Sequence, residues 1–264
     1  MVRGGVPGDR AMVLDCAIDR LDMEQTLARC RQIIERGQFA QQVSINAAKL
    51  VAMRRDEELR SIVSGCELVN ADGQAVVWAS RLLGDVLPER VAGIDLMHRL
   101  IGLAEQEGYG VYILGARRAV LETAVERLQE QFPRLTISGY RDGYFGEEEG
   151  QEVAAEIRAS GAKILFVAIS SPRKELWLGR YGPTLDVPLV MGVGGSIDIV
   201  AGAKQRAPLT WQRLGLEWLY RLLQEPRRMF RRYLHSNALF GVLMLGALTQ
   251  RGLGALACRG SAPR

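Results

Sequence analysis

The sequence has few of the residues that bind metals or form disulfide bonds. It contains two histidines, His98 and His235, which lie far apart, and four cysteines without a C-x-x-C pair. It contains no Asp-x-Asp pair. A zinc site, a divalent-ion clamp on a diphosphate and a disulfide scaffold are therefore not expected. We expect no metal and no cofactor, and we interpret the cysteines as isolated thiols in a reducing cytoplasm.

Long apolar runs are also missing. The apolar stretch near the N-terminus is interrupted by Asp15 and Asp19, so it does not resemble a signal peptide. Residues 238–248 are apolar, but eleven residues are too few to span a bilayer, and Gln250 and Arg251 follow closely. We expect this segment to be interfacial or packed against the protein, and we expect the body to stay in the cytoplasm.

Two common nucleotide-binding motifs are absent. The sequence has no G-K-[ST] phosphate loop, and the glycines from Gly192 onward do not complete G-x-G-x-x-G because position 197 is Ile. These absences argue against phosphate-loop NTPases and against dinucleotide oxidoreductases. An NAD-dependent oxidoreductase stays an alternative, which predicts binding of a nicotinamide cofactor.

Lysine is missing from the C-terminal part of the chain. From Arg213 onward there are nine arginines and two glutamates, a net charge of +7, so residues 1–212 carry −3 of the total of +4. This asymmetry argues against a nucleic-acid-binding core and directs the tail toward an anionic surface such as phospholipid headgroups. A basic helix exposed to solvent is an equally good interpretation of the charge alone.

Between residues 41 and 200, short apolar runs alternate with helical patterns. Such alternation is typical of βαβ units, and it predicts an α/β, Rossmann-like fold with a mostly parallel sheet and helices on both faces. The expected strands are residues 42–46, 67–70, 110–114, 163–169 and 187–191. The expected helices are residues 47–63, 74–83, 95–107, 116–132 and 147–159.

A break near Pro208 predicts a body of residues 1–208 and a C-terminal appendage of residues 209–264. Apolar residues recur at three- and four-residue steps from Trp211 to His235, with arginines between them. This pattern predicts one or two amphipathic helices, interrupted or restarted near Pro226.

Several residues follow expected strands, where ligands bind in parallel sheets. Asp72 lies in the segment NADG, which ends a strand and opens a helix, and Asn46 precedes a helix, although helix capping is the more common role of such residues. Gly115 and the glycines at 192, 194 and 195 permit close approach of backbone amides to a diphosphate. Without a metal, arginines are the suitable partners of a departing diphosphate.

Five segments together resemble the WecG/TagA/CpsF family of bacterial glycosyltransferases. They keep the family's order and spacing over roughly residues 40–235. The segments are NADG at 70–73, LPERVAGIDL at 87–96, GVGGSID at 192–198, RAP at 206–208 and GLEWLYRL at 215–222.

The resemblance implies an inverting, metal-independent transfer of a hexose from a UDP-sugar to a polyprenyl-diphosphate-linked saccharide. It implies a Rossmann-like body with an appendage that meets the membrane, as expected of a peripheral protein on the inner face of the plasma membrane. The roles that it implies are catalytic for Asp72 and Arg90; substrate-binding for Ser44, Asn46, Lys174, Arg221, Arg228 and Arg231; and nucleotide-binding for Gly143, Tyr144, Gly194 and Asp198. Nucleotide binding by Gly115 and Gly192 is expected from their strand-end positions.

Two positions depart from the family pattern. Lys174, in SSPRKE at 170–175, replaces the usual Gln, and Ser44 replaces the usual Thr. Because Lys cannot accept a hydrogen bond as Gln does, N-acetylmannosamine, its uronate and glucose all stay open as the donor sugar. This version is similar to the branch that includes the β-1,4-glucosyltransferases of xanthan-type exopolysaccharide assembly. The alternative function is a non-catalytic nucleotide-sugar-binding membrane scaffold of the same fold. For the assembly, a homo-oligomer stays open.

Overall fold

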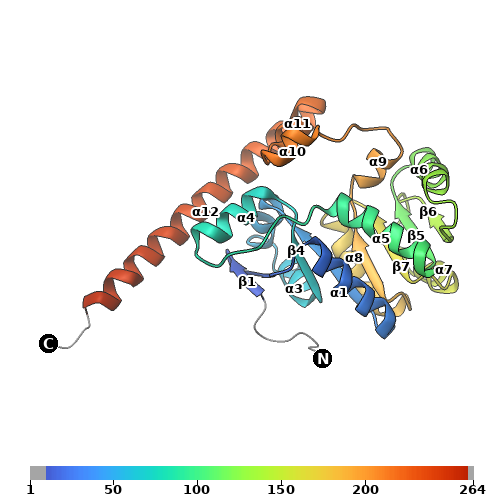
Figure 1. Cartoon of the computed structure of the whole chain (residues 1–264), viewed down its shortest axis with the longest axis horizontal. Helices are drawn as coiled ribbons and strands as arrows, with labels where there is room; N and C mark the ends of the chain where they lie inside the picture. Colours follow the sequence, from blue (N-terminus) through green and yellow to red (C-terminus); the bar gives the residue numbers. More distant parts are fainter. Residues whose placement is uncertain (1–9, 261–264) are drawn as a thin grey trace.

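A six-stranded parallel sheet forms the centre of the molecule (Figure 1). The computed structural model describes residues 10–260, except the side chains of 228–229, 231–233 and 250–260. Neighbouring strands follow the order β4-β3-β8-β7-β5-β6, and every pair is parallel. The predicted α/β fold is therefore confirmed. The strands are β3 (Ala40–Ile45), β4 (Leu68–Ala71), β5 (Val111–Gly115), β6 (Ile137–Arg141), β7 (Ile164–Ala168) and β8 (Leu189–Gly192).

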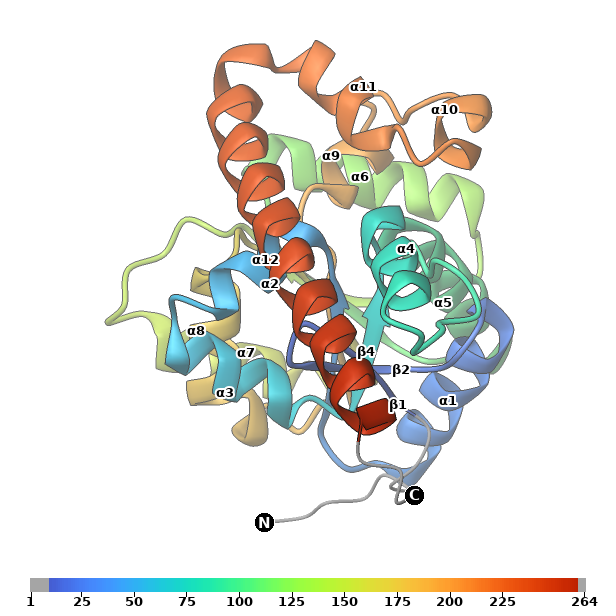
Figure 2. The same ribbon diagram turned by 90° about the vertical axis from the view of Figure 1, so that its left-hand side faces the viewer.

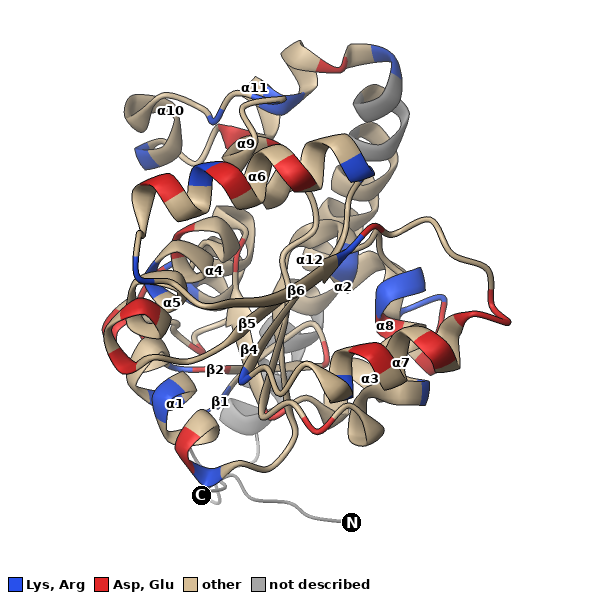
Figure 3. Cartoon of the chain, turned by 90° about the vertical axis from the view of Figure 1, so that its right-hand side faces the viewer, with Lys and Arg blue, Asp and Glu red and all other residues tan. Residues whose placement is uncertain are grey.

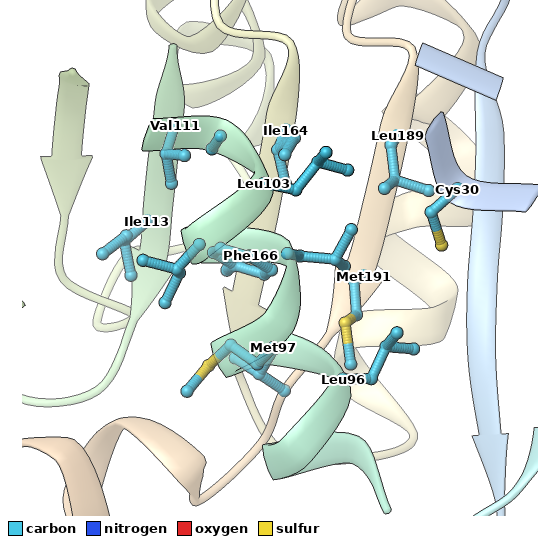
Figure 4. Close-up of a cluster of buried hydrophobic side chains, with 14 of the residues drawn as sticks. Cys30, Leu96, Met97, Leu103, Val111, Ile113, Ile164, Phe166, Leu189 and Met191 are labelled. Carbon is cyan, nitrogen blue, oxygen red and sulfur yellow. The ribbon is translucent and has the colours of Figure 1, made fainter. Parts of the chain in front are cut away.

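One face of the sheet is covered by four helices. Their apolar side chains interlock with Ile113, Phe166 and Met191 of the strands, as Figure 4 shows for part of this cluster. Burial of so much apolar surface is the main stabilising contribution to such a fold. The helices are α1 (Met23–Arg36), α5 (Gly93–Glu107), α6 (Arg118–Gln131) and α9 (Ser196–Val200).

The opposite face is covered mainly by α7 (Gly150–Ala159) and α8 (Arg173–Tyr181), followed by the 3₁₀ turn Gly182–Thr184. Val153 and Leu178 of these helices join the buried residues Leu165 and Val190 of the sheet. Figure 2 shows α7 and α8 on one side and α5 on the other. Helices on both faces explain why β5, β7 and β8 are almost continuous apolar runs.

A third cluster lies beside the β3–β4 edge. The antiparallel hairpin of β1 (Arg10–Val13) and β2 (Cys16–Asp19) packs there with α2 (Ala47–Met53), α3 (Glu57–Gly65) and α4 (Gln74–Leu82). The helix predicted over 47–63 is wrong in one respect, because it is two helices. Asp56 starts the second one by accepting a hydrogen bond from the backbone N–H of Leu59 at 2.9 Å.

Three helices follow the body: α10 (Leu209–Arg213), α11 (Glu217–Gln224) and α12 (Pro226–Gly260). The predicted restart at Pro226 is confirmed, since proline stands at the first position of α12. Within the part that the structure describes, no helix is long and apolar enough to cross a membrane. The division of the chain at residue 208 stays a prediction.

The helix α12 runs back across the molecule and contacts α2 (Figure 2). Its Met244 is buried among the residues of the third cluster, and Phe240 and Leu248 pack against the same cluster. Segment 238–248, expected to be interfacial or packed, is therefore packed against the body on one side. Val242 and Leu245 of the same segment are exposed.

Candidate active site

Two polar residues stand at the carboxyl ends of neighbouring strands. In the parallel register Ile45 of β3 lies opposite Ala71 of β4. The next residues along the two strands are Asn46 and Asp72. The backbone N–H of Asp72 donates to the carbonyl of Ile45 at 2.9 Å, and a Cβ on Gly73 would lie 3.3 Å from Cβ of Asn46. The fold thus brings Asn46 and Asp72 together at the edge where ligands bind in parallel sheets.

The Asp72 carboxylate caps α5. Its Oδ1 accepts a hydrogen bond at 3.0 Å from the backbone N–H of Gly93, the first residue of that helix. The cap of α4 is Gly73, without a side-chain hydrogen bond, so the interpretation of Asp72 as a cap at Gln74 is wrong. The hydrogen bond from Gly93 holds the carboxylate beside the N-terminal, positive end of α5.

Ser44 lies beside the same helix start. A Cβ on Gly93 would be 3.3 Å from the Ser44 Oγ, and this hydroxyl accepts a hydrogen bond from Nε2 of Gln42 at 3.2 Å. Asn46 caps α2, where its Oδ1 accepts from the backbone N–H of Lys49 at 3.0 Å. The capping role of Asn46 is therefore present, and substrate binding by Ser44 and Asn46 stays a prediction.

Two arginines and two carboxylates form what we call the arginine–carboxylate cluster. Arg90 donates from Nη1 to Oε2 of Glu217 at 2.6 Å. Arg206 makes a bidentate pair with Asp95, with distances of 2.6 and 2.7 Å. The Oε1 of Glu217 lies 3.9 Å from Nε of Arg206, so that Glu217 faces both arginines. The cluster joins the body to α11.

The negative charge of Asp72 interacts electrostatically with Arg206 of this cluster. Burial disfavours the charged guanidinium of Arg206, but hydrogen bonds to Asp95 and the charges of Asp95, Glu217 and Asp72 outweigh it. The pKa of Arg206 therefore lies above its ordinary value. The carboxylate of Asp72 at the strand end and the guanidinium group of Arg206 are thus close enough to interact.

Gly115 and Gly143, both predicted near the nucleotide, meet at the other half of the sheet edge. Gly115 has a φ of +126°, and a Cβ there would lie 2.5 Å from the carbonyl carbon of Ala168. Gly143 donates its backbone N–H to the carbonyl of Ala116 at 3.0 Å, and a Cβ on it would lie 3.0 Å from Cα of Gly115. Side chains are excluded at both positions, and both glycines are buried where these segments pack backbone against backbone.

Arg173, which the sequence analysis did not single out, holds the loop that carries these residues. Its Nη1 donates to the carbonyl of Gly143 at 3.1 Å, and its guanidinium lies 5.0 Å from the centroid of the Phe145 ring. Tyr144 is 72% exposed, so its ring is free to meet a ligand. Arg173 stands next to Lys174 in the SSPRKE segment, and this position was the sequence signal that could have pointed to Arg173.

The glycine-rich turn after β8 lies between these two halves. Gly192 pairs with Val167 of β7, and Gly194 adopts a φ of +51°. The Oδ2 of Asp198 accepts a hydrogen bond from Nζ of Lys204 at 2.8 Å. Figure 3 shows residues of both charge signs at this junction of α9 and α11, where Lys204 also lies 3.6 Å from Glu225.

The family model described as "Glycosyl transferase WecG/TagA/CpsF family" matches residues 11–253 of this chain. The chain belongs to the WecG/TagA/CpsF family. It is therefore a glycosyltransferase of cell-surface polysaccharide synthesis, with a sugar donor and an acceptor as its substrates. The family match confirms the resemblance that the five sequence segments indicated.

Lys174, one of the two positions at which this family member departs from the pattern, lies at the same sheet edge. A Cβ on Gly192 would lie 2.5 Å from Cε of Lys174, so the lysine covers the end of β8. The fully buried Glu175 pairs with Nζ of Lys49 at 2.8 Å and with Nζ of Lys174 at 3.3 Å. Burial raises the pKa of Glu175, but the two lysines outweigh it, so this pKa is lowered.

The arginines of the appendage are described only in part. Arg221 lies on α11, one turn after Glu217, and its side chain is exposed. Arg228 and Arg231 belong to α12, but their side chains lie outside the described part of the structure. The predicted roles of these three arginines stay predictions.

No group of three or more His, Cys, Asp or Glu side chains in the described part of the chain is placed to hold a metal ion. The two carboxylates of the arginine–carboxylate cluster are already paired with guanidinium groups. Metal independence of the glycosyltransferase is a separate matter, and it stays a prediction.

Proposed function

We propose that this glycosyltransferase moves a hexose from a UDP-sugar onto a polyprenyl-diphosphate-linked saccharide, with inversion and without a metal ion. The observation that carries the proposal is the proximity of the Asp72 carboxylate to the arginine–carboxylate cluster at one edge of the sheet. Inverting transfer needs one base for the acceptor hydroxyl and positive charge for the departing diphosphate. The proposed site supplies both.

In the proposed reaction Asp72 takes the proton of the acceptor hydroxyl while that oxygen attacks C1 of the donor sugar. The bond between C1 and the diphosphate oxygen breaks on the opposite side, and UDP leaves with the bonding electron pair. Arg90, Arg221, Arg228 and Arg231 stabilise the negative charge that develops on the diphosphate.

A carboxylate is a weak base toward a sugar hydroxyl, so alignment of the two substrates has to supply much of the rate. The proposal assigns this alignment to Ser44, Asn46 and Lys174 for the sugars. It assigns the UDP moiety to the glycine-rich strand ends and to Tyr144 and Asp198. The exposed ring of Tyr144, beside the packed glycines Gly115 and Gly143, supports this assignment.

The donor sugar in this proposal is N-acetylmannosamine, its uronate or glucose. The ammonium of Lys174 lies at the end of β8, where the family usually has a neutral amide. A cation there favours a different set of sugar substituents from an amide, because it donates hydrogen bonds and cannot accept them. For this reason Lys174 is the residue on which donor choice is proposed to depend.

The proposed location is the anionic inner face of the plasma membrane, where the lipid-linked acceptor lies. Several apolar side chains of the C-terminal helices are exposed beside the arginines of the same segment. Such a combination of apolar and basic residues suits an interfacial position. The exposed apolar residues are Leu214, Trp218, Leu223, Phe230 and Leu234.

A donor screen tests the proposal. UDP-linked glucose, N-acetylmannosamine and its uronate are each offered with a synthetic lipid-diphosphate sugar acceptor, and products are read by mass spectrometry. One donor should give a product heavier by one hexose residue, together with free UDP. UDP binding without product from any donor would favour a non-catalytic scaffold instead.

A further inference from the structure

Glu217 is the first residue of α11, and its carboxylate faces two arginines of the body. Its Oε2 accepts a hydrogen bond from Nη1 of Arg90 at 2.6 Å, and both side chains are largely buried, 20% and 14% exposed. Its Oε1 lies 3.9 Å from Nε of Arg206, a buried nitrogen without a hydrogen-bond partner among the described residues. A buried ion pair of this kind fixes both partners more firmly than a surface pair does.

Among the residues that the structure describes, part of each guanidinium group has no hydrogen-bond partner. Arginine has five N–H donors in a rigid fork. The hydrogen bond to Glu217 uses Nη1 of Arg90, and Asp95 takes Nη1 and Nη2 of Arg206. A carboxylate that holds one side of such a fork orients the remaining donors without competing for them.

We propose that Glu217 is a positioning residue, which orients Arg90 toward the substrate diphosphate only when α11 is docked on the body. This inference rests on the proposed function, because it assumes that Arg90 contacts the diphosphate. Glu217 itself does not touch substrate, since its negative charge would repel a phosphate. Its position on α11 makes the orientation of Arg90 depend on the C-terminal segment.

A double-mutant cycle on the full-length chain tests this role. The four proteins are the wild type, Arg90→Ala, Glu217→Ala and the variant with both changes. Each single substitution should lower kcat/KM about 10- to 100-fold, because a charge-assisted hydrogen bond is lost or misdirected. The double variant should lose no more than Arg90→Ala alone, since Glu217 acts only through Arg90. Losses that multiply in the double variant would overturn the proposal.

Two further measurements separate this role from a structural one. The melting temperatures of the same four proteins are also compared. If the ion pair were only structural, the two substitutions would be coupled in their effect on melting temperature, whereas their losses in kcat/KM would multiply. Glu225→Gln is the matched control, because it removes the carboxylate that follows the other end of the same helix and lies 3.6 Å from Nζ of Lys204. It should keep kcat/KM within about threefold of the wild type.

UDP titration by calorimetry repeats the cycle without turnover. If the intact chain binds UDP but transfers no sugar from any donor, the proposed function is wrong, and the calorimetric cycle still decides the role of Glu217. Glu217→Ala should weaken UDP binding about 10-fold or more, with no further loss in the double variant. An unchanged UDP affinity in Glu217→Ala would overturn the inference.

Discussion

At the scale of single residues, Asp72 combines a capping hydrogen bond with the proposed role of base. Asp72→Asn keeps an oxygen that can accept the N–H of Gly93, so the fold and UDP binding should be nearly intact. Loss of the base should lower turnover by about two to four orders of magnitude. Initial rates of UDP release and a UDP titration measure the two effects.

Asp56→Asn is the matched control for this substitution. Asp56 also accepts a backbone hydrogen bond at a helix start, but it does so at α3. It should therefore show the same small structural effect and wild-type turnover. Turnover of Asp72→Asn equal to that of Asp56→Asn would exclude Asp72 as the base.

Lys174 lies in α8, where its side chain is buried and its Nζ is 3.3 Å from the carboxylate of Glu175. Lys174→Gln removes one of the two cations that face this carboxylate, so a loss of about 1–3 kcal/mol in stability is expected. It should also change the preference for donor or acceptor, because an amide can accept hydrogen bonds. Competition between UDP-sugars in one reaction measures the preference.

Lys49→Gln serves as the control for Lys174→Gln. Both lysines pair with Glu175, but Lys49 comes from α2. The control should lower stability without a change in sugar preference. If both variants keep the preferences of the wild type, the argument that links donor choice to Lys174 fails.

The position of Asp72 was predictable, because it needs only the rule that ligands bind after parallel strands. Its hydrogen-bond partner was not, since Gly93 lies 21 residues further along the chain. The pair of Arg206 with Asp95 spans 111 residues, and that of Arg90 with Glu217 spans 127. Such pairs depend on how helices are placed in space, and no local pattern encodes them.

At the scale of elements, five of the six strands of the sheet were predictable. The strands β5, β7 and β8 are apolar runs because both of their faces are buried. The edge strand β6 was not predictable, since its sequence ISGYR is half-exposed throughout. The hairpin of β1 and β2 has only four residues in each strand, too few to show a period. The break between α2 and α3 depends on the cap at Asp56, which a periodic pattern does not reveal.

Truncation after Pro208 tests the C-terminal helices as a unit. The shortened chain should lose liposome binding and most transfer. It should also unfold at lower urea concentration than the intact chain, because Met244 and its neighbours leave the third cluster. If the truncated chain transferred sugar to a soluble short-chain acceptor as fast as the intact chain, the appendage would serve only as a membrane anchor.

Met244→Ala is the control that separates stability from membrane binding. It should cost about 2–5 kcal/mol, as truncation of a buried methionine does. Since it changes no arginine, liposome binding should be kept under conditions where the variant is folded.

At the scale of the whole molecule, the charge is divided between a body of −3 and a segment from Arg213 of +7. Binding to vesicles that contain anionic phosphatidylglycerol should therefore weaken as salt rises from about 50 to 500 mM, because the Debye length shortens. Sedimentation with vesicles measures the bound fraction. Equal binding to neutral phosphatidylcholine vesicles would contradict an electrostatic contribution.

Independence from metal ions is also a property of the whole reaction. Transfer should continue at its full rate in excess EDTA, because the arginines are proposed to replace a divalent ion at the diphosphate. The assay compares rates with chelator, and with chelator plus excess magnesium or manganese. Loss of activity with EDTA and its recovery with either ion would show that the arginines do not suffice.

The burial of Met244 among residues 11–87 has a consequence for the order in which the chain folds during synthesis. The first segments of the third cluster leave the ribosome long before α12 does. At about 5–20 residues per second, the interval between Leu87 and Met244 is on the order of ten seconds or more. During that time the surface of α2 that α12 later covers is open to other apolar partners. The nascent chain is therefore expected to need protection by chaperones until its last helix has been made.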